Sequence, residues 1–193
     1  MFDLLRSHIL KRIDLTDEEF HRCTTLFIPK KIRSKQFFLQ EGDVDKYIAF
    51  VAKGCLRLYS VDDKGEEHIV QFAIEDWWIS DPYSFLTGQP TIYNIDALED
   101  SELLLLTKES QEQLCLDIPK FERFFRLLLQ DKLVAMQRRI TQSISASAEE
   151  RYLQFLKSYP TIVQRVPQAH IASYLGITPQ SLSRIRKERM DHK

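Results

Sequence analysis

The 193-residue sequence predicts an α+β fold: a jelly-roll-like barrel or sandwich of short antiparallel strands with flanking helices, a long connecting helix and a C-terminal helix-turn-helix. Three observations predict it. Short runs rich in β-branched and aromatic residues alternate with turn signals from Leu26 to Leu106. A helical pattern without internal glycine or proline runs from Pro119 to about Ser145. Two short helical runs flank Gly176 near the end of the chain.

Helices are predicted before the first strand. Residues 2–12 have the apolar spacing of a short helix. Thr16 and Glu19 then form a capping box, since each side chain can accept a hydrogen bond from the other residue's backbone N–H. A second helix is therefore expected to begin after Thr16.

The strands are expected in short segments bounded by turn residues. Asp63, Lys64 and Gly65 predict a hairpin turn, in which Gly65 adopts a positive φ. No helix long enough for a βαβ crossover lies between the segments, which argues against a nucleotide-binding parallel sheet. The expected strands are residues 26–32, 36–40, 47–53, 55–61, 67–74, 91–98 and 102–106.

Helical patterns return after the strands. Thr107 is expected to cap a helix that ends near Cys115, and the long helix that follows would form a rod of about 38 Å. The long helix has two adjacent apolar faces, which suggests two packing partners: the β domain and the same helix of a second subunit. The alternative is a single wide stripe that faces one core. The proposed dimer stripe is Phe125, Leu129, Leu133, Met136, Ile140 and Ile144, and the second face is Phe121, Phe124 and Leu128.

A further capping box, Ser147 with Glu150, predicts a helix over residues 148–158 that ends before Pro160. Residues 160–166 are β-prone and are expected to be an extended connector. The domain boundaries predicted from these patterns are residues 1–117, 118–146 and 147–193.

The window from Gln168 to Lys187 predicts a DNA-reading pair of helices. Gly176 follows the first helical run, Thr178 can cap the second, and Pro179 occupies its first turn. Arg and Gln make paired hydrogen bonds to base edges, whereas Ser, Thr and Lys suit phosphate oxygens. The alternative is an ordinary helical hairpin. The candidate DNA contacts are Thr178, Gln180, Ser181, Ser183, Arg184 and Lys187.

Charge is divided unevenly along a chain whose net charge is −1. Residues 148–193 carry eight Lys and Arg against four Asp and Glu, so the remaining residues carry a net negative charge. A basic module attached to an acidic body fits a phosphate-binding surface on a sensor domain.

The composition argues against several other classes of protein. The chain has three distant cysteines, Cys23, Cys55 and Cys115, which fit neither a disulfide framework nor an iron–sulfur or zinc site. No apolar run approaches the length of a membrane span and the chain starts without a signal-peptide pattern, so we expect a cytoplasmic protein that needs no membrane. No catalytic constellation or glycine-rich phosphate loop stands out, so an enzyme is not expected.

The chain resembles the CRP/FNR family of bacterial transcription regulators over about residues 20–187. Val51–Phe72 resembles the family's β-roll hairpin, Glu41–Asp43 resembles the turn before it, and Gly176–Lys187 resembles its turn and recognition helix. The resemblance implies an antiparallel double-stranded β-helix of the cyclic-nucleotide-binding type. It also implies a homodimer on double-stranded DNA, with RNA polymerase as a candidate protein partner. A sensor that acts through protein contacts without binding DNA remains the alternative.

The resemblance also indicates where an effector would bind. Family members that bind cyclic nucleotides use an acidic residue and an Arg-Ser pair, and this chain has Asp81 and Thr91-Ile92 in the matching segment. Without the arginine no cation balances a buried phosphate, so we expect weak or no cyclic AMP binding and an unknown effector. Arg57 is the nearest alternative cation by sequence.

Aromatic, cysteine and histidine residues are the candidates for binding other ligands. Aromatic residues in the segment could line a pocket for an apolar ligand or simply belong to the core. A lone Cys23 cannot hold the iron–sulfur cluster of the family's redox branch, and no metal is expected; His8, His21 and His68 leave haem open. The residues assigned to an effector pocket are Trp78, Asp81, Tyr83, Thr91, Tyr93, Met136 and Gln137.

Overall fold

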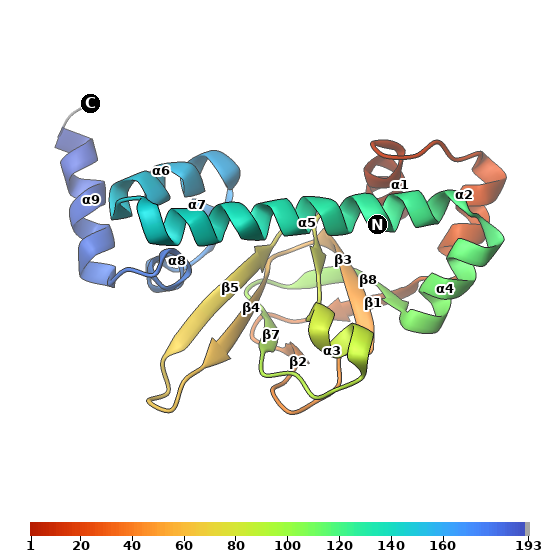
Figure 1. The fold of residues 1–193 in the computed structure, drawn as a ribbon, viewed down its shortest axis with the longest axis horizontal. Coiled ribbons are helices and arrows are strands. Elements are labelled where there is room, and N and C mark those ends of the chain that lie inside the picture. The colour runs from red at the N-terminus through yellow and green to blue at the C-terminus, as the bar shows by residue number, and fades with distance from the viewer. Residues whose placement is uncertain (192–193) are drawn as a thin grey trace. The chain divides into compact units, whose positions relative to one another are not determined.

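The computed structural model describes residues 1–191, with side chains described for residues 1–189. These residues form two compact units. The first contains Met1–Ser60 and Gln71–Gln130, and the second contains Val61–Val70 and the chain from Asp131 onward. Figure 1 shows α5 (Lys120–Ser145) as one continuous helix to which both units contribute.

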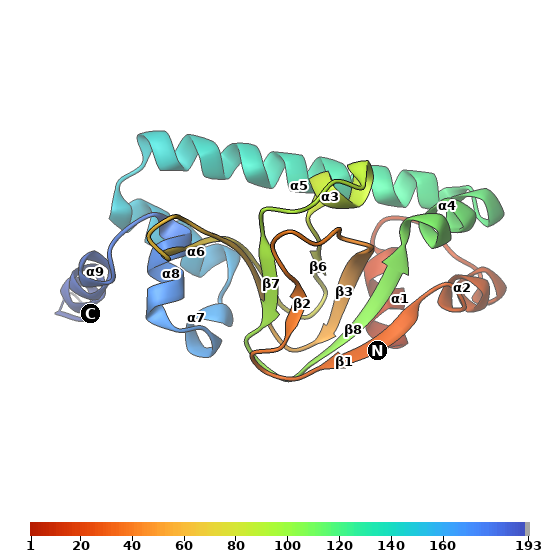
Figure 2. The ribbon, with the colours of Figure 1, turned by 90° about the horizontal axis from the view of Figure 1, so that it is seen from below.

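Two four-stranded antiparallel sheets form a β-roll, as predicted (Figure 2). Their strand orders are β1-β8-β3-β6 and β2-β7-β4-β5. The strands are β1 (Ile28–Ile32), β2 (Phe37–Leu39), β3 (Tyr47–Lys53), β4 (Leu56–Val61), β5 (Glu67–Ala73), β6 (Trp78–Ile79), β7 (Asn94–Ala97) and β8 (Ser101–Thr107).

The pairing of β3 with β8 separates two apolar faces. Phe50 lies opposite Leu104, and both belong to a core that also contains helical residues. Val51 lies opposite Leu103 on the other face of the same sheet, and both are fully buried. Because side chains alternate along a strand, one sheet supplies both the roll interior and the surface on which helices pack.

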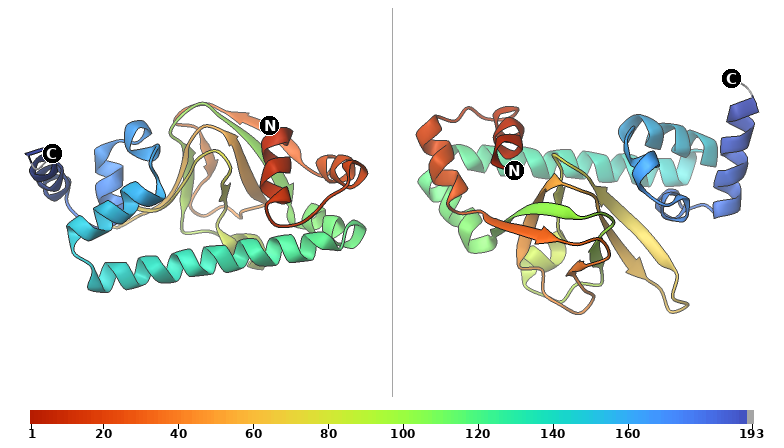
Figure 3. Two further views of the ribbon diagram at one scale, coloured as in Figure 1. Left: turned by 90° about the horizontal axis from the view of Figure 1, so that it is seen from above. Right: turned by 180° about the vertical axis from the view of Figure 1, so that it is seen from behind.

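Helices cover one face of the first unit: α1 (Phe2–Leu10), α2 (Asp17–Thr24), α4 (Lys108–Asp117) and the first turns of α5 (Figure 3). The capping box of Thr16 and Glu19 is present at the start of α2, and Thr107 caps α4. Both predictions are confirmed. The core beneath these helices comprises Leu5, Ile9, Ile13, Cys23, Phe27, Phe50, Leu104, Leu106, Leu114, Ile118, Phe121, Phe124 and Phe125.

The second unit joins the tip of the β4–β5 hairpin to the helices that follow α5. These helices are α6 (Ala148–Ser158), α7 (Ile162–Arg165), α8 (Gln168–Leu175) and α9 (Pro179–Asp191). The predicted capping box of Ser147 and Glu150 is present at the start of α6. Among the described residues, no helix is both long and apolar enough to cross a lipid bilayer.

The structure differs from the predicted elements at three places. The β-prone segment 160–166 contains the short helix α7, because Ile162 and Val166 both bury their side chains, and a helical turn places residues four apart on one face. The two-residue strand β6 and the short helix α3 (Pro82–Thr87) were not predicted. Strand β7 begins at Asn94, later than expected, since residues 91–93 belong to the turn that follows α3.

Candidate nucleic-acid interface

Helices α8 and α9 meet at a sharp turn around Gly176. This residue has φ 65° and ψ 39°, which is the left-handed conformation that favours glycine. The N–H of Gly176 donates to the carbonyl of Ser173, and the N–H of Ile177 donates to the carbonyl of Ala172. These two bonds satisfy carbonyls that the helix end would otherwise leave open. The glycine is required by its backbone conformation rather than by space, because an added Cβ would meet nothing within 4 Å.

Thr178 begins the second helix as predicted. Its hydroxyl oxygen accepts a hydrogen bond from the N–H of Ser181 at 3.1 Å and donates to the Ser181 hydroxyl at 3.0 Å. Pro179 occupies the first position of α9, where the missing N–H has no helical acceptor. The Thr178 and Ser181 hydroxyls therefore already form hydrogen bonds at the start of α9. Each oxygen can still accept one further hydrogen bond.

The inner faces of α8 and α9 form a small apolar core with α6. Side chains from all three helices are at most 6% exposed in this core, and the helices pack pairwise. Burial of these side chains fixes which face of α9 is left outside. The core residues are Tyr152, Phe155, Ile171, Ala172, Leu175, Leu182 and Ile185.

The outer face of α9 carries most of the predicted DNA contacts. Gln180, Ser183, Arg184 and Lys187 are all exposed, and the Arg184 side chain retains 74% of its accessible surface. One acid of the same helix, Glu188, approaches it: Glu188 Oε1 lies 4.0 Å from Arg184 Nε. An exposed pair at this distance is weak, so it leaves the guanidinium available to another acceptor.

The proposed dimer stripe of α5 is exposed except at its first position. Phe125 is only 7% exposed and belongs to the core of the first unit, so its assignment to the stripe was wrong. It joins Phe121 and Phe124, whose rings it contacts, because the core of the first unit extends along these first turns of α5. The remaining positions, Leu129, Leu133, Met136, Ile140 and Ile144, are 54–81% exposed.

The residues assigned to an effector pocket fall into separate environments. Asp81 caps α3, and its carboxylate accepts hydrogen bonds from the Tyr83 N–H and from the Thr91 hydroxyl at 2.7 Å. The Thr91 oxygen also accepts from the N–H of Tyr93. The Asp81 N–H donates to Asp45. The polar groups of this cluster therefore form hydrogen bonds with one another and with the neighbouring backbone.

Three other residues assigned to the pocket are exposed on their own helices. The Tyr83 side chain is 62% exposed on α3, and Met136 and Gln137 are exposed residues of the α5 segment in the second unit. Arg57, the alternative cation, is buried on β4 and donates two hydrogen bonds to the Asp96 carboxylate, at 2.7 and 2.9 Å. Its charge is thus already balanced.

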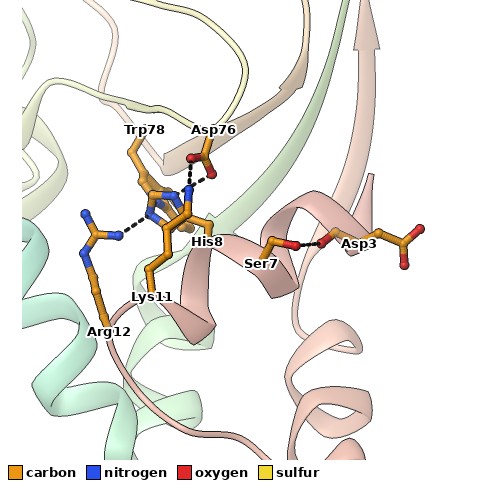
Figure 4. Close-up of polar contacts among 7 residues, drawn as sticks. All are labelled: Asp3, Ser7, His8, Lys11, Arg12, Asp76 and Trp78. Carbon is orange, nitrogen blue, oxygen red and sulfur yellow. Dashed lines mark hydrogen bonds and ion pairs between the residues drawn. The ribbon is translucent and has the colours of Figure 1, made fainter.

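Trp78 is half-buried on β6 and its ring packs edge-on against the buried ring of His8. Figure 4 shows the polar contacts around His8. The indole Nε1–H donates to His8 Nε2 at 3.1 Å, and Arg12 also approaches this nitrogen at 3.2 Å. Because both neighbours can only donate, Nε2 must accept, and the ring proton sits on Nδ1, which donates to Asp76 at 2.7 Å. His8 is therefore held as the neutral ring.

Burial lowers the pKa of His8 below its ordinary value of 6.5, and the neighbouring Asp76 only partly offsets this effect. As the pH falls below 6.5 the unfolded chain binds the proton before the folded protein does, so stability decreases toward acid pH. We expect urea unfolding followed by tryptophan fluorescence to give a lower unfolding free energy at pH 5.5 than at pH 7.5. A His8→Gln variant should lose this part of the pH dependence; an unchanged slope would contradict the assignment.

Cys23 and the acidic cluster at the hairpin tip each have a structural explanation. Burial raises the pKa of Cys23 to about 12, which keeps it a thiol at neutral pH. Asp62, Glu66 and His68 cluster at the exposed hairpin tip, where Asp62 accepts from the N–H groups of Lys64 and Glu66. These bonds build the turn at Gly65, whose φ is 81°, as predicted.

Sequence reasoning missed a set of polar contacts that holds α8 to the hairpin tip. Ser173 of α8 donates to the carbonyl of Glu67 at 2.6 Å and accepts from the N–H of Ile69 at 3.0 Å. Arg139 of α5 donates to the carbonyls of Ile69 and Tyr174, at 2.9 and 3.2 Å. The partners lie 35 to 106 positions apart, so no local pattern in the sequence signals them.

Comparison with known proteins agrees with this architecture. Residues 29–117 match the cyclic nucleotide-binding domain family. Over 183 residues, which cover 89% of this chain, the sequence is 22% identical to the regulatory protein HlyX of Actinobacillus pleuropneumoniae (75% of that protein) and 24% identical to the fumarate and nitrate reduction regulatory protein of Vibrio cholerae (72%). The solved structure of FixK2 from Bradyrhizobium japonicum aligns with a TM-score of 0.76 at 17% identity, over 86% of this chain and 85% of that one.

Proposed function

This chain belongs to the CRP/FNR family of transcription regulators, and from this premise we propose that it binds a roughly palindromic DNA site as a dimer, through the exposed face of α9. The observation that carries the proposal is the outward presentation of Gln180, Arg184 and Lys187 on a helix whose opposite face is buried. Such a helix can enter a major groove without rearranging its own core. The role is binding in the cytoplasm rather than catalysis.

The dimer is supported by the α5 stripe. Five large apolar side chains at spacings of three and four residues are more than half exposed along one helix. A contiguous apolar surface of this kind usually marks a protein contact, and a second copy of the same helix presents a matching surface. RNA polymerase is a further proposed partner, since a regulator must act on transcription.

For the effector, we propose that cyclic AMP is not the ligand. Asp81 and Thr91 bind each other, and Arg57 is engaged by Asp96, which leaves the predicted phosphate site without an available cation among these residues. Calorimetric titration with cyclic AMP is the direct test, and saturable binding would refute this part of the proposal.

The proposed function is tested by selecting sites from a random DNA library and measuring gel-shift affinity for the selected site. The Arg184→Ala variant should lose about 1–3 kcal/mol of discrimination between the selected site and unrelated DNA, because a paired contact to guanine is removed. Lys187→Ala serves as the comparison: it should weaken binding to all sequences alike and reduce the salt slope by about 1. Failure of the unmodified protein to bind DNA at low salt would contradict the proposal and favour a sensor that works through protein contacts.

A further inference from the structure

The hairpin tip and α8 are joined at a strand edge. In its sheet, β5 is the terminal strand, and its residues 67–70 belong to the second unit together with α8. The Ser173 hydroxyl uses both of its hydrogen-bonding roles on this edge, donating to Glu67 and accepting from Ile69. A hydroxyl that donates and accepts along one strand is held in a single orientation.

Arg139 ties the same edge to the end of α8 and to α5. Its guanidinium donates to the carbonyls of Ile69, Val70 and Tyr174, and it lies 4.2 Å from the centre of the Tyr174 ring. The rigid fork of an arginine makes such a set of contacts directional, and a lysine could not reproduce it. The Tyr174 carbonyl lies at the C-terminal end of α8, where a cation is favoured.

A second arginine binds the same C-terminal end of α8. Arg151 of α6 donates to the carbonyl of Leu175 at 3.1 Å and to the carbonyl of Ala146, just after α5, at 2.8 Å. None of these polar contacts belongs to the apolar core of α6, α8 and α9. The apolar core already packs α8 against α9. The polar contacts additionally fix where this helix pair lies relative to α5 and the hairpin tip.

We infer that Arg139 and Ser173 are positioning residues, which set where the recognition helix is held relative to the dimer helix. Arg139 lies between Met136 and Ile140 in sequence, on the flank of the exposed α5 stripe. In a dimer built on that stripe, the contact from Arg139 to α8 fixes how far each α9 lies from the twofold axis. That distance decides which half-site spacing the protein accepts. The inference rests on the proposed function.

The test compares three DNA molecules that derive from the site selected by the unmodified protein: the palindrome, the same half-sites with two base pairs inserted between them, and a single half-site. In the double variant Arg139→Gln, Ser173→Ala, the preference for the palindrome over the lengthened site should fall about tenfold, while half-site affinity stays within about twofold. Arg138→Gln and Ser158→Ala, which remove the same groups from exposed positions, are the matched controls. Ser173→Thr keeps the hydroxyl and should retain the preference.

Hydrogen exchange gives a readout that needs no DNA. The Ile69 amide should be protected in the unmodified protein and in Ser173→Thr, and should exchange faster in Ser173→Ala. An unprotected Ile69 amide in the unmodified protein would overturn the contact itself. An unchanged spacing preference in the double variant would overturn the positioning role alone, whereas absence of any DNA binding by the unmodified protein would overturn the proposed function and the positioning role with it.

Discussion

Replacing Leu133 and Ile140 together by aspartate should convert the protein to a monomer and weaken binding to a palindromic site by at least about 100-fold. Both side chains lie on the exposed stripe of α5, at 66% and 58% exposure. Charges introduced at the centre of a helix–helix contact would be buried without partners on association. A monomer also loses the second half-site, and with it the gain of about 10²–10⁴ that linked binding provides.

Sedimentation velocity and gel shifts measure the two effects separately. Since the stripe is exposed within a single chain, the variant should keep its circular dichroism spectrum and its single-half-site affinity. Ala135→Asp with Thr141→Asp is the matched control, because these exposed positions of α5 lie off the stripe and receive the same two charges. A variant that still sediments as a dimer would show that another surface forms the contact.

Replacing Asp96 by alanine should lower the free energy of unfolding by about 3–5 kcal/mol. Asp96 receives two hydrogen bonds from Arg57 and lies 3.4 Å from the Tyr59 hydroxyl, and both members of the ion pair are less than a tenth exposed. The loss is large because the arginine keeps its buried charge after its principal partner is removed. Arg57 and Asp96 lie directly opposite each other on β4 and β7, so strand pairing holds the two side chains together.

Urea denaturation of three variants distinguishes the pair from simple loss of packing. Arg57→Met combined with Asp96→Leu replaces both charges by apolar groups of similar volume and should destabilise the protein less than Asp96→Ala alone. Glu102→Ala removes an acid from a more exposed pair with Lys31 and should have a much smaller effect. If Asp96→Ala behaved like Glu102→Ala, the buried pair would not be a major contributor to stability.

Local chemistry made much of the fold predictable. The capping boxes at Thr16 and Ser147 place two helix starts, because side chain and backbone satisfy each other within four residues. Gly65 and Gly176 place two turns for an equally local reason, their positive φ. The helix-turn-helix was predictable because its signals lie within about twenty residues of one another.

The errors concern contacts between distant segments. The sequence leaves open whether Trp78 lines a pocket or belongs to the core, and in the structure it donates to His8, seventy positions away. Phe125 continued the period of the α5 stripe, yet the helices of the first unit bury it. The sequence could not show that Arg57 would meet Asp96 or that Asp81 would bind Thr91, because strand register and the turn after α3 bring these residues together.

The contacts made by Ser173 and Arg139 also bear on solubility. A terminal strand whose backbone groups are open offers a template on which another chain can add a strand, and this is a common origin of aggregation. In this protein, side chains from two helices occupy backbone groups of Glu67, Ile69 and Val70. While they remain in place, the hairpin cannot extend its sheet into a neighbouring molecule along these residues.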